Sequence, residues 1–208
     1  MKKYNKMREH SIPPLEANKP EHIEIKMVIL GFESTGKNTF SIKLTSKSDK
    51  DFNQRLSKNI LTIGAKYRRI NIKFEKKTFL VHICITPGHE SFYSQFNLYI
   101  NQSNIILIFY DPLNRYSFDK IKYFMELIKN IIPSSENLVI AIVRSKYELN
   151  IDKNNSKNIV SDEEALEYAD KNNLLFFHLS IFEKYETGIK ELINSVLKYY
   201  NKILQNNN

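Results

Sequence analysis

Cysteine is nearly absent from this sequence, and so are long apolar runs; each absence excludes a class of protein. Cys84 is the only cysteine in 208 residues, which excludes a disulfide framework and favours a reducing, cytoplasmic setting. The longest apolar runs, such as Ile105 to Tyr110, have the length of a strand, whereas a membrane helix needs about 20 apolar residues. No apolar signal core follows the start of the chain. We therefore expect a cytoplasmic, globular protein.

Signals for lipid attachment are also lacking. Lys2 excludes N-myristoylation, and the last residues, Gln205 to Asn208, contain no cysteine that could be prenylated. We expect no direct lipid anchor, so a protein partner would have to bring this protein to the surface of any membrane on which it acts.

The charge is unbalanced, but it does not point to one kind of partner. The formal net charge of +8 is compatible with a polyanionic ligand. The lysines, however, are scattered and rarely run more than two together, which favours a solvated basic surface. We expect no nucleic-acid partner, because that hypothesis would rest on the net charge alone.

What is present is an alternation of strand and helix patterns. After a polar segment predicted as a flexible tail, residues 1–20, apolar or alternating runs predict strands at 21–30, 62–75, 79–85, 105–110, 138–143 and 174–179. Helical spacing predicts helices at 36–46, 117–132, 161–171 and 187–204, and a short helical segment at 90–101. Residues 46–59 are polar without a period and predict a long surface loop; residues 205–208 predict a disordered tail. Alternating units of this kind favour one α/β domain over residues 21–204, with helices on both faces of a mostly parallel sheet.

The segment Gly31 to Thr39 has the pattern of a phosphate-binding loop, or P-loop. It joins a buried strand to a helix, and its two glycines precede a lysine. Backbone N–H groups, the lysine ammonium and the start of the helix would all face an anion. The pattern requires Ser or Thr after the lysine to bind Mg²⁺, but this chain has Asn38. The candidate phosphate-binding residues in this segment are Gly31, Ser34, Thr35, Gly36, Lys37, Asn38 and Thr39.

Further polar segments follow the predicted strands at their carboxyl ends. They are Thr86 to His89, Asp111, Arg144 to Glu148 and Ser180. Ligands of parallel α/β sheets bind at this edge, so we expect these segments to surround the phosphate-binding loop.

With these positions in place, residues 22 to 200 resemble the small GTPases of the Ras superfamily, and most closely the Rab branch. Thr62-Ile63-Gly64 is similar to the switch I segment, and Glu90-Ser91-Phe92 stands where switch II has Glu-Arg-Phe. The run from Tyr110 to Phe118 is similar to the family's Tyr-Asp-x-x-(Asn/Asp)-(Arg/Glu)-x-Ser-Phe. The resemblance implies a P-loop NTPase-type small G domain, a monomer with a six-stranded, mostly parallel sheet.

The resemblance also implies roles for particular residues. Thr62 and Gly88 would contact the phosphates, and Asn38 and Thr62 would be the metal ligands, although Mg²⁺ binding is in doubt because the switch II Asp is replaced by Ile85. His89 stands at the position that orients the attacking water and is the candidate catalytic residue. The implied guanine-binding residues are Ser145, Lys146, Glu148, Ser180 and Ile181.

Two functions remain open from the sequence. The first is a Rab-like protein that binds GTP and GDP, acts in vesicle trafficking and has impaired or absent GTP hydrolysis; whether it is still an enzyme is open. The alternative is a pseudo-GTPase that recruits protein partners without Mg²⁺-dependent nucleotide binding. Under both, effectors or regulators would bind the switch regions, with Phe92, Tyr93 and Phe96 on the binding face.

Overall fold

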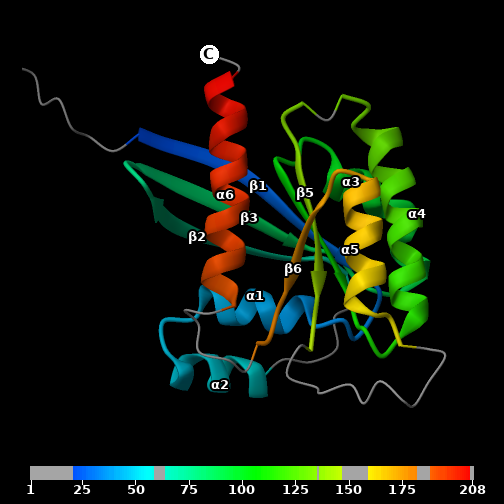
Figure 1. Ribbon diagram of the computed structural model, residues 1–208. Helices are drawn as coiled ribbons and strands as arrows, with labels where there is room; N and C mark the ends of the chain where they lie inside the picture. The colour runs from blue at the N-terminus through cyan, green and yellow to red at the C-terminus, as the bar shows by residue number, and fades with distance from the viewer. Residues whose placement is uncertain (1–20, 59–63, 135, 147–158, 182–187, 207–208) are drawn as a thin grey trace, which may run out of the picture.

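The computed structural model describes residues 21–58, 64–134, 136–146, 159–181 and 188–206 (Figure 1). Within them, six strands form one sheet in the order β2-β3-β1-β4-β5-β6. Only β2 is antiparallel to its neighbour, which confirms the predicted mostly parallel sheet. The strands are β1 (Glu21–Gly31), β2 (Lys66–Phe74), β3 (Lys77–Ile85), β4 (Ile105–Tyr110), β5 (Val139–Arg144) and β6 (Leu175–His178).

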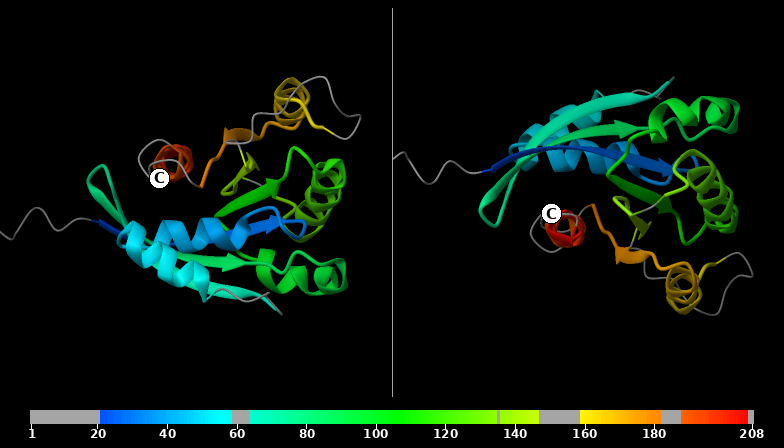
Figure 2. Two further views of the ribbon diagram at one scale, coloured as in Figure 1. Left: turned by 90° about the horizontal axis from the view of Figure 1, so that it is seen from below. Right: turned by 90° about the horizontal axis from the view of Figure 1, so that it is seen from above.

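Helices cover both faces of the sheet, as Figures 1 and 2 show. Those that share a core on one face are α1 (Lys37–Thr45), α2 (Asp49–Ser57) and α6 (Ile189–Asn206). Those on the other face are the 3-10 helix η1 (Glu90–Gln95), α3 (Phe96–Ile100), α4 (Arg115–Ile131) and α5 (Asp162–Lys171). The central strand β1 serves both cores because its side chains alternate: Met27 and Ile29 belong to the first, Val28 and Leu30 to the second.

The prediction of a long surface loop at 46–59 is wrong, because Asp49 to Ser57 form helix α2. The Ser48 hydroxyl caps the helix by accepting a hydrogen bond from the Asp51 N–H, and two acidic residues lie in the first turn, where the helix dipole favours them. Phe52 anchors the helix with a side chain that is 4% exposed and lies under the Lys43 ammonium. One buried ring is too few for a visible sequence period.

The last helix is longer than predicted. α6 continues through Asn206, so Gln205 and Asn206 are helical rather than part of a disordered tail. The predicted tail at residues 1–20 lies outside the described residues. None of the helices described is long and apolar enough to cross a membrane.

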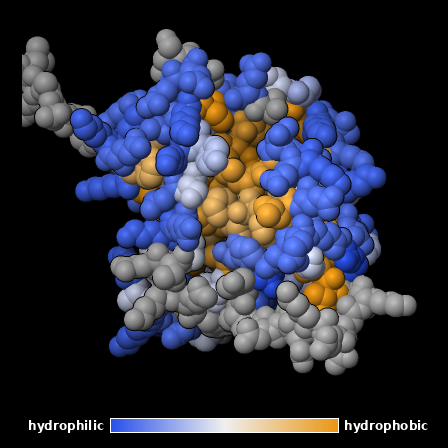
Figure 3. All heavy atoms as spheres, viewed as in Figure 1, coloured by the Kyte–Doolittle hydropathy of each residue, from blue (hydrophilic) through white to orange (hydrophobic). Residues whose placement is uncertain are grey.

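Apolar side chains reach the surface between α6 and α5 (Figure 3). The edge strand β6 runs there and contributes half-buried Leu175, Phe176 and Phe177. The opposite edge of the sheet is β2, whose outward-facing residues are mainly polar or charged.

Candidate functional site

The phosphate-binding loop lies between β1 and α1, as predicted. Gly36, with φ of 85°, occupies the N-cap position of α1 in a left-handed conformation that disfavours a side chain. The Lys37 ammonium turns back and donates hydrogen bonds to the carbonyls of Gly31 and Phe32, both at 2.6 Å. Thr35 is buried and its hydroxyl donates to the Phe32 carbonyl at 2.8 Å. The loop is therefore closed on itself by the side chains of Lys37 and Thr35.

The remaining predicted residues of the loop differ in exposure. Ser34 is exposed and has φ of 59°, while Asn38 and Thr39 are half-buried in the first turn of α1. Glu33 is exposed, so its carboxylate has access to water. This exposure to water weakens the repulsion that a carboxylate in this loop would exert on phosphates.

Lys37 is the most perturbed basic group of the loop. Burial lowers its pKa from 10.5 to about 7, and the negative charge of Glu33 offsets part of this shift. A bound anion would favour the charged amine, so phosphate binding and protonation of Lys37 support one another.

Gly88 lies directly against the loop. A Cβ atom at this position would be 2.5 Å from Glu33 Cα and 2.9 Å from Lys37 Nζ, so a side chain would force the two segments apart. Thr86 fixes this approach, because its N–H and its hydroxyl both donate to the Ile29 carbonyl of β1, at 3.1 and 3.0 Å. The structure thus brings Gly88 and the phosphate-binding loop together as predicted.

The residues at the predicted metal position do not fit Mg²⁺. Ile85 is buried, 2% exposed, and has no oxygen to offer. The Asn38 amide oxygen faces a cation already: Arg68 Nη2 lies 3.5 Å from Asn38 Oδ1, and Arg68 Nε donates to the Ser41 hydroxyl at 3.0 Å. Mg²⁺ requires near-octahedral oxygen ligands. Across the described residues there is no group of three His, Cys, Asp or Glu side chains able to hold a metal ion, and Thr62 lies outside them.

His89 has a structural contact that the sequence did not reveal. It is the N-cap of η1, where its Nδ1 accepts from the Ser91 N–H at 3.3 Å and lies 2.8 Å from the Ser91 hydroxyl. The ring is thereby held toward its own helix. This cap contact gives the side chain a local role that does not require catalysis.

The predicted base-binding residues converge on the other side of the loop. Ser145 is fully buried and its hydroxyl donates to the Tyr110 carbonyl at 2.8 Å, which ties the ends of β4 and β5 together. Lys146 forms an ion pair with Asp111. Ile181 lies within 3.3 Å of a Cβ built on Gly36, so this segment touches the phosphate-binding loop.

Ser180 supplies an independent sign of a ligand at this end. It is 3% exposed, and its hydroxyl finds no hydrogen-bond partner among the described atoms. A buried hydroxyl without a partner is costly, and a bound base or sugar would be one way to satisfy it. Glu148 lies outside the described residues.

The predicted partner-binding face needs correction. Tyr93 and Phe96 are core residues, 7% and 0% exposed, and Phe92 is half-buried. Tyr93 stacks on Tyr123 of α4 with ring centroids 5.3 Å apart. The helical spacing of the segment predicts Phe92, Phe96 and Tyr99 as its inward side chains, which is correct for Phe96 but misses Tyr93.

The sequence did not reveal the contacts of Glu90, nor those of Arg68 with α1. The Glu90 carboxylate pairs with Lys120 of α4 at 2.7 Å and accepts from the Tyr116 hydroxyl, and Tyr116 packs edge-on against Phe32 of the loop. These contacts join segments far apart in the chain. No local pattern marks them.

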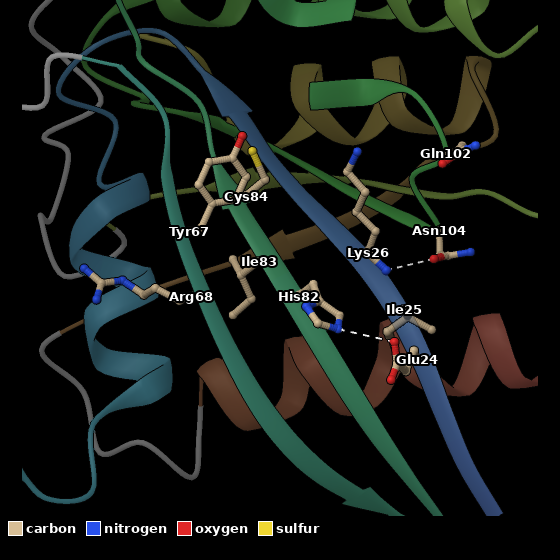
Figure 4. A pocket seen from close by; sticks show the side chains of 10 residues that line it. All are labelled: Glu24, Ile25, Lys26, Tyr67, Arg68, His82, Ile83, Cys84, Gln102 and Asn104. Atoms are coloured by element: carbon tan, nitrogen blue, oxygen red, sulfur yellow. Dashed lines mark hydrogen bonds and ion pairs between the residues drawn. The ribbon is translucent and has the colours of Figure 1, made fainter. Parts of the chain in front are cut away.

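A cavity of about 360 Å³ opens on the sheet away from the candidate site (Figure 4). Most of its lining comes from β1, β2 and β3, including Lys26, His82 and Cys84. None of the predicted phosphate- or base-binding residues lines it. Arg68 borders the cavity at its strand, but its side chain points away from it and toward α1.

Comparison with known proteins links this geometry to one family. The sequence model of the Ras family matches residues 26–202, a span that includes every candidate site residue. The Ras-related protein RabQ of Dictyostelium discoideum is 26% identical over 183 residues, which cover 86% of this chain and 83% of RabQ. The Ras-related protein Rab-5B of Plasmodium falciparum (isolate 3D7) is 28% identical over 188 residues, which cover 86% of this chain and 84% of Rab-5B.

Proposed function

The chain belongs to the Ras family and is Rab-like, and we propose that within this family it binds guanine nucleotide while its GTP hydrolysis is impaired or absent. The observation that carries the proposal is the closed phosphate-binding loop. The buried Lys37 supports retained phosphate binding, because burying a charged amine is costly and a bound anion would offset that cost; the close contact at Gly88 keeps the loop in shape.

Impaired hydrolysis is supported by what surrounds the phosphates. Hydrolysis in this family depends on an oriented water and on positive charge that neutralises the transferring phosphoryl group. The cap contact of His89 with Ser91 and the replacement of the metal-anchoring Asp by Ile85 both weaken that machinery. The expected activity is therefore binding with slow or no turnover.

A pseudo-GTPase that recruits partners is the second candidate. It is favoured by Asn38, which already contacts Arg68, and by Ser145, whose short side chain already donates its hydroxyl hydrogen bond to the Tyr110 carbonyl. The buried hydroxyl of Ser180, which has no partner among the described atoms, favours the first candidate, since a bound base or sugar would satisfy it.

We also propose that the protein acts in vesicle trafficking through effectors or regulators, as its Rab relatives' family suggests. The exposed apolar residues beside the switch region are better contacts for such partners than the buried rings of η1. Tyr67 on β2 is 70% exposed and Leu98 on α3 is 75% exposed.

The deciding experiment uses the purified full chain. Co-purifying nucleotide is identified after denaturation, and labelled GDP and GTP are then titrated onto nucleotide-free protein, with single-turnover GTP hydrolysis measured alongside. We expect saturable binding and hydrolysis below ordinary small-GTPase rates. If neither nucleotide binds up to about millimolar concentration, which corresponds to a binding free energy of about −4 kcal/mol, the proposal is contradicted and the pseudo-GTPase is favoured.

A further inference from the structure

An arginine of the sheet reaches the position where a metal ion would be anchored. Arg68 stands on β2, and in Figure 4 its side chain points away from Tyr67 and His82, across the strand toward α1. Its guanidinium contacts Asn38 and Ser41, one helical turn apart on α1. The charge therefore lies beside the first turn of the helix, where the backbone N–H groups face the phosphate site.

Two other cations lie near Arg68, one beside the first turn of α1 and one at the far end of that helix. Lys66 precedes Arg68 by two residues on the same side of β2 and lies opposite Ile85 in the register. The Arg55 guanidinium donates to the Thr45 carbonyl at the end of α1 at 2.9 Å. Burial is the larger cause that lowers the pKa of Arg68, and the charge of Arg55 lowers it further. Burial is likewise the larger cause that lowers the pKa of Lys66, and the charge of Arg68 is the second. Arg68 and Lys66 repel one another near the phosphate-binding loop, so both would gain from an anion bound there.

We propose that the Arg68 guanidinium takes the place of the divalent ion, so that this site binds a nucleoside diphosphate without Mg²⁺ and gains little from adding it. The inference rests on the proposed nucleotide binding. Guanidinium is permanently charged and matches the geometry of phosphate oxygens with parallel N–H donors. It carries one positive charge where Mg²⁺ carries two, so it leaves more of the charge of a triphosphate uncompensated than of a diphosphate.

The test titrates labelled GDP onto nucleotide-free full-length protein in buffer with Mg²⁺ or with EDTA. We expect the two dissociation constants of the unchanged protein to agree within about twofold. In EDTA, Arg68→Gln should weaken GDP binding by about tenfold or more, because it removes a charge-assisted hydrogen bond. Arg69→Gln is the matched control: Arg69 is the next residue, exposed on the opposite side of β2, and its change should leave binding within about twofold.

Arg68 also joins β2 to α1, so its loss could act through the fold. Thermal unfolding of each variant measures this, and Arg68→Lys, which keeps the charge, should bind GDP in EDTA more tightly than Arg68→Gln. If Arg68→Gln unfolds, the Mg²⁺ dependence of the unchanged protein and of Arg68→Lys still decides.

Three results would overturn the inference. Binding that Mg²⁺ strengthens by about tenfold or more would overturn it and leave the proposed function standing. A folded Arg68→Gln variant that binds GDP in EDTA as the unchanged protein does would also overturn it alone. No GDP binding in either buffer would overturn the inference together with the proposed function.

Discussion

Lys37 and Asn38 are neighbours in the chain, yet the regions they belong to differ in what they have kept. The phosphate-binding loop around Lys37 keeps its glycines, its lysine and its buried hydrogen bonds. The metal position around Asn38 has an amide that faces an arginine and an isoleucine that cannot ligate. A ligand site can therefore retain one half of its chemistry while the other half changes.

The difference follows from how each half is built. Phosphate is held largely by backbone N–H groups, which depend on loop shape and on close packing at positions such as Gly88. Mg²⁺ is held by particular side-chain oxygens, and a single substitution removes them. Mutations in the two regions should thus act on different measurements.

Removing the lysine should give the largest effect. Lys37→Met keeps the apolar stem but removes the charge that would contact phosphate, so affinity for GDP should fall by roughly a hundredfold. Isothermal titration of nucleotide-free protein measures it. Lys50→Met, a change on the exposed surface of α2, is the control and should leave affinity unchanged. Equal affinities for the unchanged and Lys37→Met proteins would break the contrast between the two regions.

The contrast also separates what could be predicted from the sequence. The loop, its glycines and most of the order of strands and helices follow from local patterns, so the fold was predicted correctly except for α2, while phosphate binding stays a prediction. The contact between Arg68 and Asn38 joins residues 30 positions apart, and a β2 side chain reaching α1 leaves no local signal. For the same reason the cap at His89 and the inward turn of Tyr93 emerged only from the structure.

A side chain at Gly88 should give the next largest effect. Gly88→Ala places a Cβ 2.5 Å from the Glu33 backbone, so the loop must shift, at a cost of about 2 kcal/mol in stability, and GDP affinity should fall about tenfold. Gly64→Ala is the comparison, because Gly64 has φ of 92° but no atom within 4 Å of the added Cβ. It should cost only about 1 kcal/mol. Chemical denaturation of both variants would show whether close packing or backbone conformation governs the loss of stability. Equal losses in the free energy of unfolding would favour backbone conformation.

The stability of the nucleotide-free protein should change by a smaller amount for each pH unit. The pKa of Lys37 in the folded state, about 7, lies below its ordinary value of 10.5, so the unfolded chain binds the proton more tightly. Burying the charged Lys37 amine therefore destabilises the folded state by its full amount below pH 7. This loss of stability shrinks as pH rises toward 10.5. The free energy of unfolding should therefore gain up to about 1.4 kcal/mol per pH unit in this window from this group. Denaturant titrations across the window, with Lys37→Met as the reference, isolate the contribution; parallel pH profiles for the two proteins would contradict it.

The smallest effect should come from the rim of the loop, where contacts are exposed. Glu90→Gln weakens the ion pair with Lys120 and the hydrogen bond from Tyr116, and the Tyr116 ring packs against Phe32 of the loop. Solvent screens such pairs, so GDP affinity should stay within about twofold of the unchanged protein. The titration of labelled GDP used for the arginine variants measures this, and Glu163→Gln on α5 serves as an acidic control away from the loop. A loss as large as that of Gly88→Ala would mean that the exposed contacts of α4, rather than the buried backbone, hold the phosphate-binding loop in shape.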